Sequence, residues 1–319
     1  MLTVLFATYN RAKLLPHVLN AFCGLAQPFG GWKLVIVDNG STDNTREVID
    51  SFNERLPVTY VLEPQQGKNA ALNSGLSYLE GDLLVLTDDD VFPYPDWLVQ
   101  IRATADAHPE CAVFGGRIIP RWESSPSSWI LAWVPLSPVF SISNPAASDG
   151  PAGCDKIYGP NMAVRADVFS AGYRFDKQIG PKGSNYPMGS ESELINRLLR
   201  SGCLGWYCPG AVAEHFIPQS HLEKTWILGR AVRYGRGMYR LTMVERKIAG
   251  VFWLGVPLRI FRGMLEEQIR ILMALLSFNR EECFQARWRF HFLLGEAIES
   301  RNIRAEGSAS SVVQKAFWQ

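Results

Sequence analysis

Three adjacent carboxylates, Asp88, Asp89 and Asp90, follow the apolar run Leu83–Leu86. A short apolar run of this kind predicts a buried β-strand, so the carboxylates lie where that strand enters a loop. Carboxylate oxygens are hard ligands that suit Mg²⁺ or Mn²⁺, and these ions commonly bind substrate phosphates as well. A solvated acidic turn is the alternative for the triplet taken alone, because short motifs are unspecific.

The segments around the triplet alternate between strand-like and helix-like patterns. Strands are expected over residues 2–7, 33–37, 58–62 and 81–86, and helices over residues 13–25, 45–52 and 69–78. This alternation predicts parallel β-α-β units in an open, doubly wound α/β sheet. In such sheets, ligands bind beyond the carboxyl ends of the strands.

Polar clusters follow three of the four predicted strands. Residues 8–11 follow the first strand, residues 38–43 the second and residues 88–90 the fourth. Because the carboxyl ends of parallel strands share one edge, we expect the three clusters to lie together. Asp38-Asn39-Gly40 on its own is also an ordinary turn, so the combination of clusters predicts the site.

The charge of the chain is unevenly distributed. The formal net charge is +1, yet residues 1–223 hold 16 basic and 23 acidic side chains, whereas residues 224–304 hold 15 basic and 7 acidic ones. An acidic body therefore carries a basic arm. This asymmetry indicates a negatively charged partner for the arm.

Length and cysteine usage bound the class of protein. The 319 residues allow one large domain or two ordinary ones, with enough apolar content for a core. Six cysteines are scattered without a C-x-x-C pair, which favours free thiols over disulfides or a zinc site. Residues 1–10 lack the basic and apolar regions of a secretory signal, so we expect a cytoplasmic protein.

Several motifs occur in the order and spacing of family 2 glycosyltransferases of the GT-A fold, which the chain resembles. They are Ala-Thr-Tyr-Asn-Arg at 7–11, Val-Asp-Asn-Gly-Ser-Thr-Asp at 37–43, Gly-Lys-Asn-Ala-Ala-Leu-Asn at 67–73, Thr-Asp-Asp-Asp at 87–90, and the segments 159–165 and 191–198. The resemblance implies a Rossmann-like, mostly parallel sheet flanked by helices. It also implies an inverting transferase that uses a nucleotide-sugar donor, expected to be a UDP-sugar, and a hydroxyl of a glycan or lipid-linked acceptor.

By this resemblance, the base and ribose of the donor lie over the ends of the first two strands. The expected contacts are Thr8, Tyr9, Arg11 and Asp38, with Lys68 placing a cation near the nucleotide. The alternative for Tyr9 is a half-buried aromatic that packs on the sheet. The alternative for Arg11 and Lys68 is a solvated position at a helix end.

The aspartate motif of the family implies a Mn²⁺ or Mg²⁺ cofactor that bridges the two phosphates of the donor. Asp88 and Asp90 occupy the motif positions and are the expected ligands, whereas Asp89 is expected beside the donor as a ligand or a helper. His215 is a third expected ligand, because many relatives place a histidine near the metal or leaving phosphate, and imidazole can bind Mn²⁺. His221 is a second choice.

Glu191 is the expected general base that removes the proton from the acceptor hydroxyl. The family has an acidic pair here with Asp as the base, whereas this chain has Ser190 followed by Glu191. A longer carboxylate can still serve if it reaches the proton. Asn161 and Glu193 are expected to contact the sugar or the acceptor. Alternatively, Glu191 and Glu193 are ordinary acidic residues at a helix N-terminus.

The basic arm shows apolar residues at helical spacing over residues 222–239 and 251–276. A proline and nearby charges leave no uninterrupted run long enough to span a bilayer. We expect peripheral helices at the inner face of the membrane, where Arg259, Arg262 and Arg270 contact anionic headgroups. Packing on the body or between subunits is the alternative, and nucleic acid is not expected because the acidic body would repel it.

These expectations divide the chain into a catalytic domain over residues 1–221, a helical extension over 222–304 and a tail over 305–319. Within the first, residues 1–120 form the nucleotide-sugar half and residues 121–221 the acceptor half. Two other functions stay open. A nucleotidyltransferase could use a similar sheet and metal site, although no glycine-rich basic loop follows the first strand. A non-catalytic sugar-nucleotide or glycan-binding protein is the other, because the expected base departs from the family pattern.

Overall fold

A computed structural model describes residues 1–183, 186–245 and 251–316 of the protein. The chain forms two compact units. The first, here called the sheet unit, comprises Met1–Ser124, Leu136–Gly183 and Ser190–Pro218. The second, the helical unit, comprises Ser125–Pro135, residues 186–189 and the described residues from Gln219 onward.

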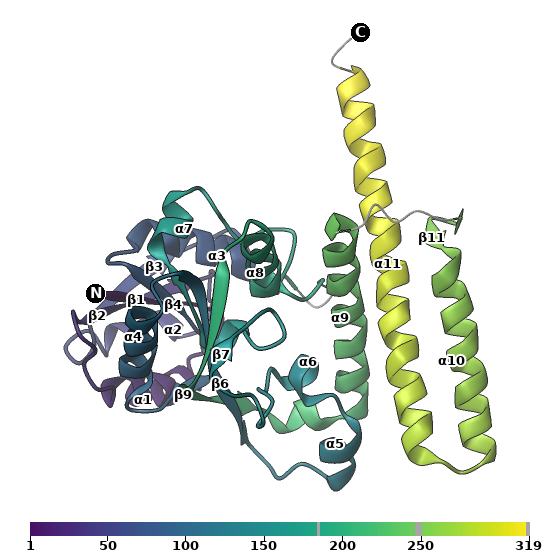
Figure 1. The fold of residues 1–319 in the computed structure, drawn as a ribbon, viewed down its shortest axis with the longest axis horizontal. Helices are drawn as coiled ribbons and strands as arrows, with labels where there is room; N and C mark the ends of the chain where they lie inside the picture. The colour runs from purple at the N-terminus through teal and green to yellow at the C-terminus, as the bar shows by residue number, and fades with distance from the viewer. Residues whose placement is uncertain (184–185, 246–250, 317–319) are drawn as a thin grey trace. The chain divides into compact units, whose positions relative to one another are not determined.

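A single mixed sheet forms the centre of the sheet unit (Figure 1). Its strands are β1 (Leu2–Thr8), β2 (Trp32–Asp38), β3 (Val58–Leu62), β4 (Leu83–Leu86), β5 (Val91–Pro93), β6 (Cys111–Trp122), β7 (Gly150–Pro151), β8 (Met162–Arg165) and β9 (Leu204–Ile217). The described strands lie in the order β3-β2-β1-β4-β8-β6-β9-β5, with β7 paired to β9. The first four strands are parallel, and β8 runs antiparallel between β4 and β6. The predicted α/β class with a mostly parallel sheet is therefore confirmed.

Helices cover both faces of this sheet. They are α1 (Leu15–Cys23), α2 (Thr45–Asp50), α3 (Lys68–Gly75), α4 (Trp97–Ala107), α7 (Ala166–Ser170) and α8 (Ser190–Arg200). The sheet unit also contains the short helix α6 (Leu136–Phe140). Helices α1, α2 and α4 contribute to one apolar core, and α3, α7 and α8 contribute to the other. The two cores hold the ends of the central strands in place.

Strand β1 shows why these elements form where they do. Val4 and Phe6 face the core of α1, Leu5 faces the core of α3, and all three are fully buried. Such burial on both faces is typical of a parallel strand, and each side chain of this size contributes about 1.5–3 kcal/mol. A Cβ atom on Gly75 would lie 2.4 Å from Cδ1 of Leu5, so glycine allows α3 to pack this closely on β1.

The helical unit contains long antiparallel helices. Its elements are α5 (Ser128–Trp133), α9 (Lys224–Glu245), β10 (Phe252–Trp253), β11 (Val256–Pro257), α10 (Leu258–Leu276) and α11 (Arg280–Ala316). Helix α11 packs between α9 and α10 (Figure 1). Among the described residues, no helix is both long and apolar enough to cross a membrane.

Two expectations for the arm need correction. Residues 251–257 were expected to be helical, but they include the β10–β11 hairpin, which turns through Leu254 and Gly255 at φ values of 48° and 80°. Helix α11 continues past residue 304 to Ala316, so the expected boundary between extension and tail does not coincide with a helix end. Residues 317–319 of the expected tail lie outside the described residues.

The arginines that were expected to face lipid headgroups are paired inside the helical unit. Arg259 lies 3.2 Å from a carboxylate oxygen of Glu296, and Arg262 lies 2.7 Å from one of Glu266. Arg270 pairs with Glu267 at 2.9 Å and also with Glu282. These guanidinium groups already have carboxylate partners, so the basis for their predicted membrane contact is weakened.

A buried ion-pair cluster joins α9 to α11. Glu299 is fully buried and accepts hydrogen bonds from Arg236 at 2.6 Å and from Arg240. Nearby, a Cβ atom on Gly235 would lie 2.0 Å from the carbonyl oxygen of Phe292, so glycine permits the close approach of the two helices. Both the close packing at Gly235 and the ion pairs of Glu299 hold α9 against α11.

We expect Glu299→Gln to lower the free energy of unfolding by about 3 kcal/mol, because it removes the negative charge that compensates two buried guanidinium groups. Chemical denaturation followed by circular dichroism measures this change. The matched control is Glu266→Gln, whose ion pair with Arg262 is exposed and is worth about 0.5 kcal/mol or less. Equal losses in the two variants would contradict the structural role of Glu299.

Candidate active site

The three polar clusters meet at the carboxyl ends of β1, β2 and β4. Thr8 lies beside Asp38 in the parallel register of β1 and β2, and β1 also pairs with β4. The hydroxyl of Thr8 donates to Oδ2 of Asp89 at 2.8 Å. The loops that follow β1 and β4 are therefore in direct contact.

The loops after β1 and β2 hold each other through side chains. Asn10 has a φ of 53°, a conformation that asparagine tolerates better than most residues. Its side-chain oxygen accepts the N–H of Thr42 at 2.8 Å, and its own N–H donates to Ser41 Oγ at 2.9 Å. Asp43 accepts the N–H of Ala12 at 3.1 Å. These bonds fix the backbone on both sides of Arg11.

Arg11 extends from this loop to the aspartate triplet. Its Nε donates to Oδ1 of Asp89 at 3.2 Å, and its terminal nitrogen lies 3.5 Å from Oδ2 of Asp90. Burial raises the pKa of Asp89 to about 7, although the charge of Arg11 opposes the shift. Both carboxylate oxygens of Asp89 are engaged, by Thr8 and by Arg11. Asp89 thus holds the loop after β4 to Thr8 and Arg11. The sequence alone did not distinguish this role from that of a metal ligand such as Asp90.

Lys68 lies between two carboxylates. Its Nζ forms a short ion pair with Asp88 and lies 2.7 Å from Oε1 of Glu191. Burial alone would lower the pKa of Lys68, but the charges of Asp88 and Glu191 raise it above its ordinary value. Burial opposes ionisation of Asp88, but the charge and hydrogen bond of Lys68, together with nearby positive charge, outweigh this effect and lower the pKa of Asp88. One cation thus joins the aspartate motif to the expected base.

Backbone features place Lys68 and Glu191, and the sequence did not reveal them. Oδ1 of Asn39 accepts the N–H of Gly67 at 2.8 Å, and Gly67 has a φ of 133° that disfavours other residues. A Cβ atom on Gly159 would lie 2.4 Å from Cδ of Glu191, so the carboxylate occupies space that only glycine leaves free. The conformation of Gly67 and the space beside Gly159 depend on tertiary contacts.

His215 meets Asp90 because β5 and β9 pair antiparallel, with Val91 opposite His215. Nε2 of His215 lies 3.5 Å from Oδ1 of Asp90. Nδ1 of His215 donates to the carbonyl oxygen of Phe140 at 2.6 Å. That bond fixes the orientation of the ring, with Nε2 on the side of the carboxylate. The partner of His215 is a backbone carbonyl, which no sequence motif could identify.

The charges and donors of this cluster fit a divalent cation. Oδ1 of Asp90 is buried and has no hydrogen-bond partner, and Nε2 of His215 lies 3.5 Å from it. A carboxylate oxygen and an imidazole nitrogen are both ligand types that Mn²⁺ accepts. The four carboxylates of Glu191 and the triplet also outnumber the two permanent cations, Arg11 and Lys68. Within the described residues, however, no three His, Cys, Asp or Glu side chains already form a group that could hold a metal ion.

Asn161 and Glu193 do not match the expected contacts with sugar or acceptor. Asn161 is fully buried; its amide nitrogen donates to two backbone carbonyls, and its oxygen accepts the indole N–H of Trp97 at 2.8 Å. Glu193 is 8% exposed, and Arg197 binds both of its oxygens, at 2.5 and 2.8 Å. Internal contacts already occupy these polar groups, so we leave both residues out of the proposed site, and their contacts with sugar or acceptor stay predictions.

The remaining expected residues are placed as follows. Tyr9 is 48% exposed at the end of β1. Asp38 is buried, and its two oxygens accept the N–H of Ser41 and the hydroxyl of Tyr60 at 2.8 and 3.0 Å. His221 belongs to the helical unit, where it stacks on Trp226 with ring centroids 3.9 Å apart.

Known proteins share the sequence features of this chain. The profile of Glycosyl transferase family 2 matches residues 3–169. A glucosyl-dolichyl phosphate glucuronosyltransferase of Haloferax volcanii is 24% identical over 247 residues, which cover 73% of this chain and 74% of that protein. An undecaprenyl-phosphate 4-deoxy-4-formamido-L-arabinose transferase of Salmonella paratyphi A is 25% identical over 108 residues, or 33% of each chain.

Solved structures share the fold. The mannosyltransferase PcManGT from Pyrobaculum calidifontis, in complex with GDP-Man and Mn²⁺, matches with a TM-score of 0.63 and 18% identity, covering 94% of this chain and 86% of that one. TarS 1–349 of S. aureus in complex with UDP matches with a TM-score of 0.53 and 14% identity, covering 92% of this chain and 90% of that one. The family match and the shared GT-A fold together show that the chain belongs to glycosyl transferase family 2 and is a glycosyltransferase.

Proposed function

We propose that the protein is an inverting, metal-dependent glycosyltransferase that moves a sugar from a nucleotide-sugar donor to a hydroxyl of a glycan or lipid-linked acceptor. The observation that carries this proposal is the position of Lys68 between Asp88 and Glu191. Lys68 thereby joins Asp88, at the proposed site of the donor diphosphate, to Glu191, the candidate base. Glycosyl transfer requires the diphosphate and the base to lie near the same sugar.

The donor end of the site is formed by the loops after β1 and β2. Tyr9 offers an exposed ring on which a base could stack, and Thr8 and Asp38 lie at the adjacent strand ends. Arg11 and Lys68 supply positive charge beside the position proposed for the diphosphate. We expect a UDP-sugar as donor. The two structural neighbours hold GDP-Man and UDP, so both bases belong in the test.

Asp90, Asp88 and His215 are the proposed ligands of a Mn²⁺ or Mg²⁺ ion. When bound, such an ion supplies a Lewis acid that stabilises the charge of the departing nucleoside diphosphate. The unpaired oxygen of Asp90 and the fixed ring orientation of His215 support this assignment. Asp89 keeps Arg11 and the β1 loop in position.

Glu191 is the proposed base for the transfer. Its carboxylate takes the proton of the acceptor hydroxyl, the hydroxyl oxygen forms a bond to the anomeric carbon, and the bond to the diphosphate oxygen breaks. A single displacement of this kind inverts the configuration at that carbon. Lys68 holds Glu191 through an ion pair, and Gly159 leaves space for it.

The acceptor class is supported by the relatives. Two of them are named for dolichyl phosphate and undecaprenyl-phosphate substrates. We therefore extend the proposal to a sugar hydroxyl on a polyprenyl-phosphate-linked acceptor. A protein that only binds the donor is the competing function, and turnover distinguishes the two.

We expect UDP with Mn²⁺ to raise the melting temperature more than GDP with Mn²⁺, and Asp90→Asn to abolish the Mn²⁺-dependent part of the shift. A ligand at about 100 times its dissociation constant stabilises by about 2.7 kcal/mol, which a thermal-shift assay detects. The control is Asp82→Asn, because Asp82 flanks the opposite end of β4. A Mn²⁺-dependent shift that persists in Asp90→Asn, or transfer unaffected by EDTA, would contradict the metal assignment.

Glu191→Gln should retain donor affinity but lower the transfer rate by about 10² to 10⁴-fold, the usual contribution of a general base. Donor binding is measured by calorimetry and transfer by release of nucleoside diphosphate with an acceptor panel. Glu193→Gln is the matched control on the same helix and should keep most of the rate. Full turnover in the Glu191 variant would place the base elsewhere, and binding without turnover by the wild type would favour a non-catalytic protein.

Lys68→Met should destabilise the protein without ligands, by about 3 kcal/mol, because it leaves two partly buried carboxylates without their shared cation. Added Mn²⁺ should stabilise this variant more than it stabilises the wild type. Lys33→Met provides the comparison, since Lys33 pairs at 2.5 Å with the 60%-exposed side chain of Glu80. Both variants would be followed by thermal and chemical denaturation. Equal stability losses would argue against a special role for Lys68.

A further inference from the structure

The turn between α10 and α11 carries an apolar tip. We define this tip as Leu272, Met273, Leu275, Leu276 and Phe278, which are 51–90% exposed. Successive residues of an α-helix point about 100° apart, so the four tip residues on α10 cover an arc of about 160°. Phe278 lies beyond the last residue of that helix. Ala274, at 3% exposure, marks the side that packs within the helical unit.

The middle of α10 differs from the tip. Leu265 and Ile269 are 59% and 50% exposed, and they lie on one side of the helix. The exposed ion pair of Arg262 and Glu266 flanks them. A narrow stripe with charged edges is ordinary for a surface helix, whereas a wide apolar arc that continues into the following turn is not.

Two exposed arginines follow the tip at the start of α11. Arg280 is the first residue of that helix, and Arg287 lies two turns later. Among the described residues, neither guanidinium group has a carboxylate partner, in contrast to Arg262 and Arg270. Positive charge is therefore available beside the apolar tip.

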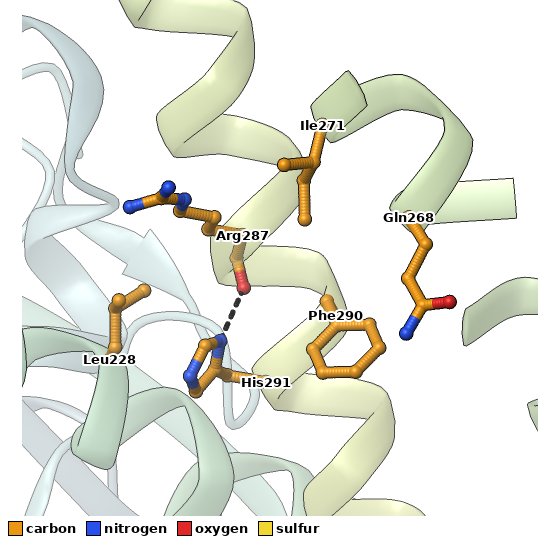
Figure 2. Close-up of a pocket in the computed structure, with 6 residues that line it drawn as sticks. All are labelled: Leu228, Gln268, Ile271, Arg287, Phe290 and His291. Carbon is orange, nitrogen blue, oxygen red and sulfur yellow. Dashed lines mark hydrogen bonds between the residues drawn. The ribbon is translucent and has the colours of Figure 1, made fainter. Parts of the chain in front are cut away.

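A groove of about 280 Å³ lies near the tip within the helical unit (Figure 2). It is lined by Leu228 of α9, Gln268 and Ile271 of α10, and Arg287, Phe290 and His291 of α11. Nδ1 of His291 donates to the carbonyl oxygen of Arg287 at 2.8 Å, as Figure 2 shows. Apolar walls beside a guanidinium group suit an acyl chain next to a phosphate.

The base of the tip is braced. Trp129 and Trp133 of α5 pack on Phe284, with ring centroids 5.3 and 6.4 Å apart, and Gln285 donates to the carbonyl oxygen of Trp133 at 2.8 Å. A pre-ordered element loses little conformational entropy on binding. The tip is thus presented on a supported first turn of α11.

We propose that this tip inserts into an anionic lipid bilayer, with Arg280 and Arg287 on headgroup phosphates and the apolar side chains among the upper acyl chains. A bilayer can take up the end of a helical hairpin, which matches the wide apolar arc on the last turns of α10 and the 90% exposure of Phe278 after that helix. A second copy of the chain fits less well, because a two-fold contact places the same surface of each copy together and would bring the free arginines near one another. This inference does not depend on glycosyl transfer.

Vesicle co-sedimentation of the full chain without donor tests the proposal. Binding should require phosphatidylglycerol in phosphatidylcholine vesicles and should weaken as salt rises. Leu276→Glu with Phe278→Glu should reduce binding at least tenfold. The matched control, Leu265→Glu with Ile269→Glu, changes two exposed apolar residues in the middle of α10 and should stay within about twofold.

The charge contribution has its own pair of variants. Arg280→Gln with Arg287→Gln should reduce binding to anionic vesicles about 30-fold, since each basic residue near the surface contributes about 1 kcal/mol. Arg262→Gln with Arg270→Gln, which removes two paired arginines, should have a much smaller effect. Unchanged melting temperatures establish that each variant is folded.

The proposal would be overturned if the wild type bound no vesicles, if it bound neutral and anionic vesicles equally, or if the tip and mid-helix variants lost the same amount of vesicle binding. It would also be overturned if analytical ultracentrifugation showed a wild-type dimer that the tip variant converts to a monomer, because the tip would then be a contact between copies.

Discussion

The ion pairs of Lys68 with Asp88 and Glu191 are the interaction on which the site depends. Partly buried carboxylates at the ends of a parallel sheet need compensating charge, and one ammonium group supplies it to two of them. The strand end at Asn39 and the positive φ of Gly67 determine where that ammonium lies. The conformation at Gly67 and the start of α3 therefore serve one electrostatic requirement, which is to place a positive charge between the carboxylates of Asp88 and Glu191.

Much of the sheet unit could be predicted because its signals are local. Apolar runs and their polar endings gave the strands β1 to β4, and ordered motifs gave the family, which is confirmed. The sequence also selected Asp90, which the structure places near Arg11 and His215, and Glu191, which it places near Lys68. It could not show that Asn161 is saturated by internal bonds, because those partners come from α4, β6 and β9, which are distant in the sequence.

Charge acts differently in the two units. In the sheet unit, carboxylates exceed the cations that face them, so a further cation would be stabilised there. In the helical unit, Arg259, Arg262 and Arg270 meet glutamates, and composition alone could not reveal this pairing. A basic total is thus a poor guide to where free positive charge lies, since it counts paired and unpaired arginines alike.

The ladder between β5 and β9 has a consequence for local opening. The N–H of Phe216 donates to the carbonyl oxygen of Asp90 at 2.8 Å, directly beside the pair formed by Asp90 and His215. If the short strand β5 separated from β9, the side chains of Asp90 and His215 would therefore move apart. Amide hydrogen exchange of Phe216 should report the free energy of this local opening.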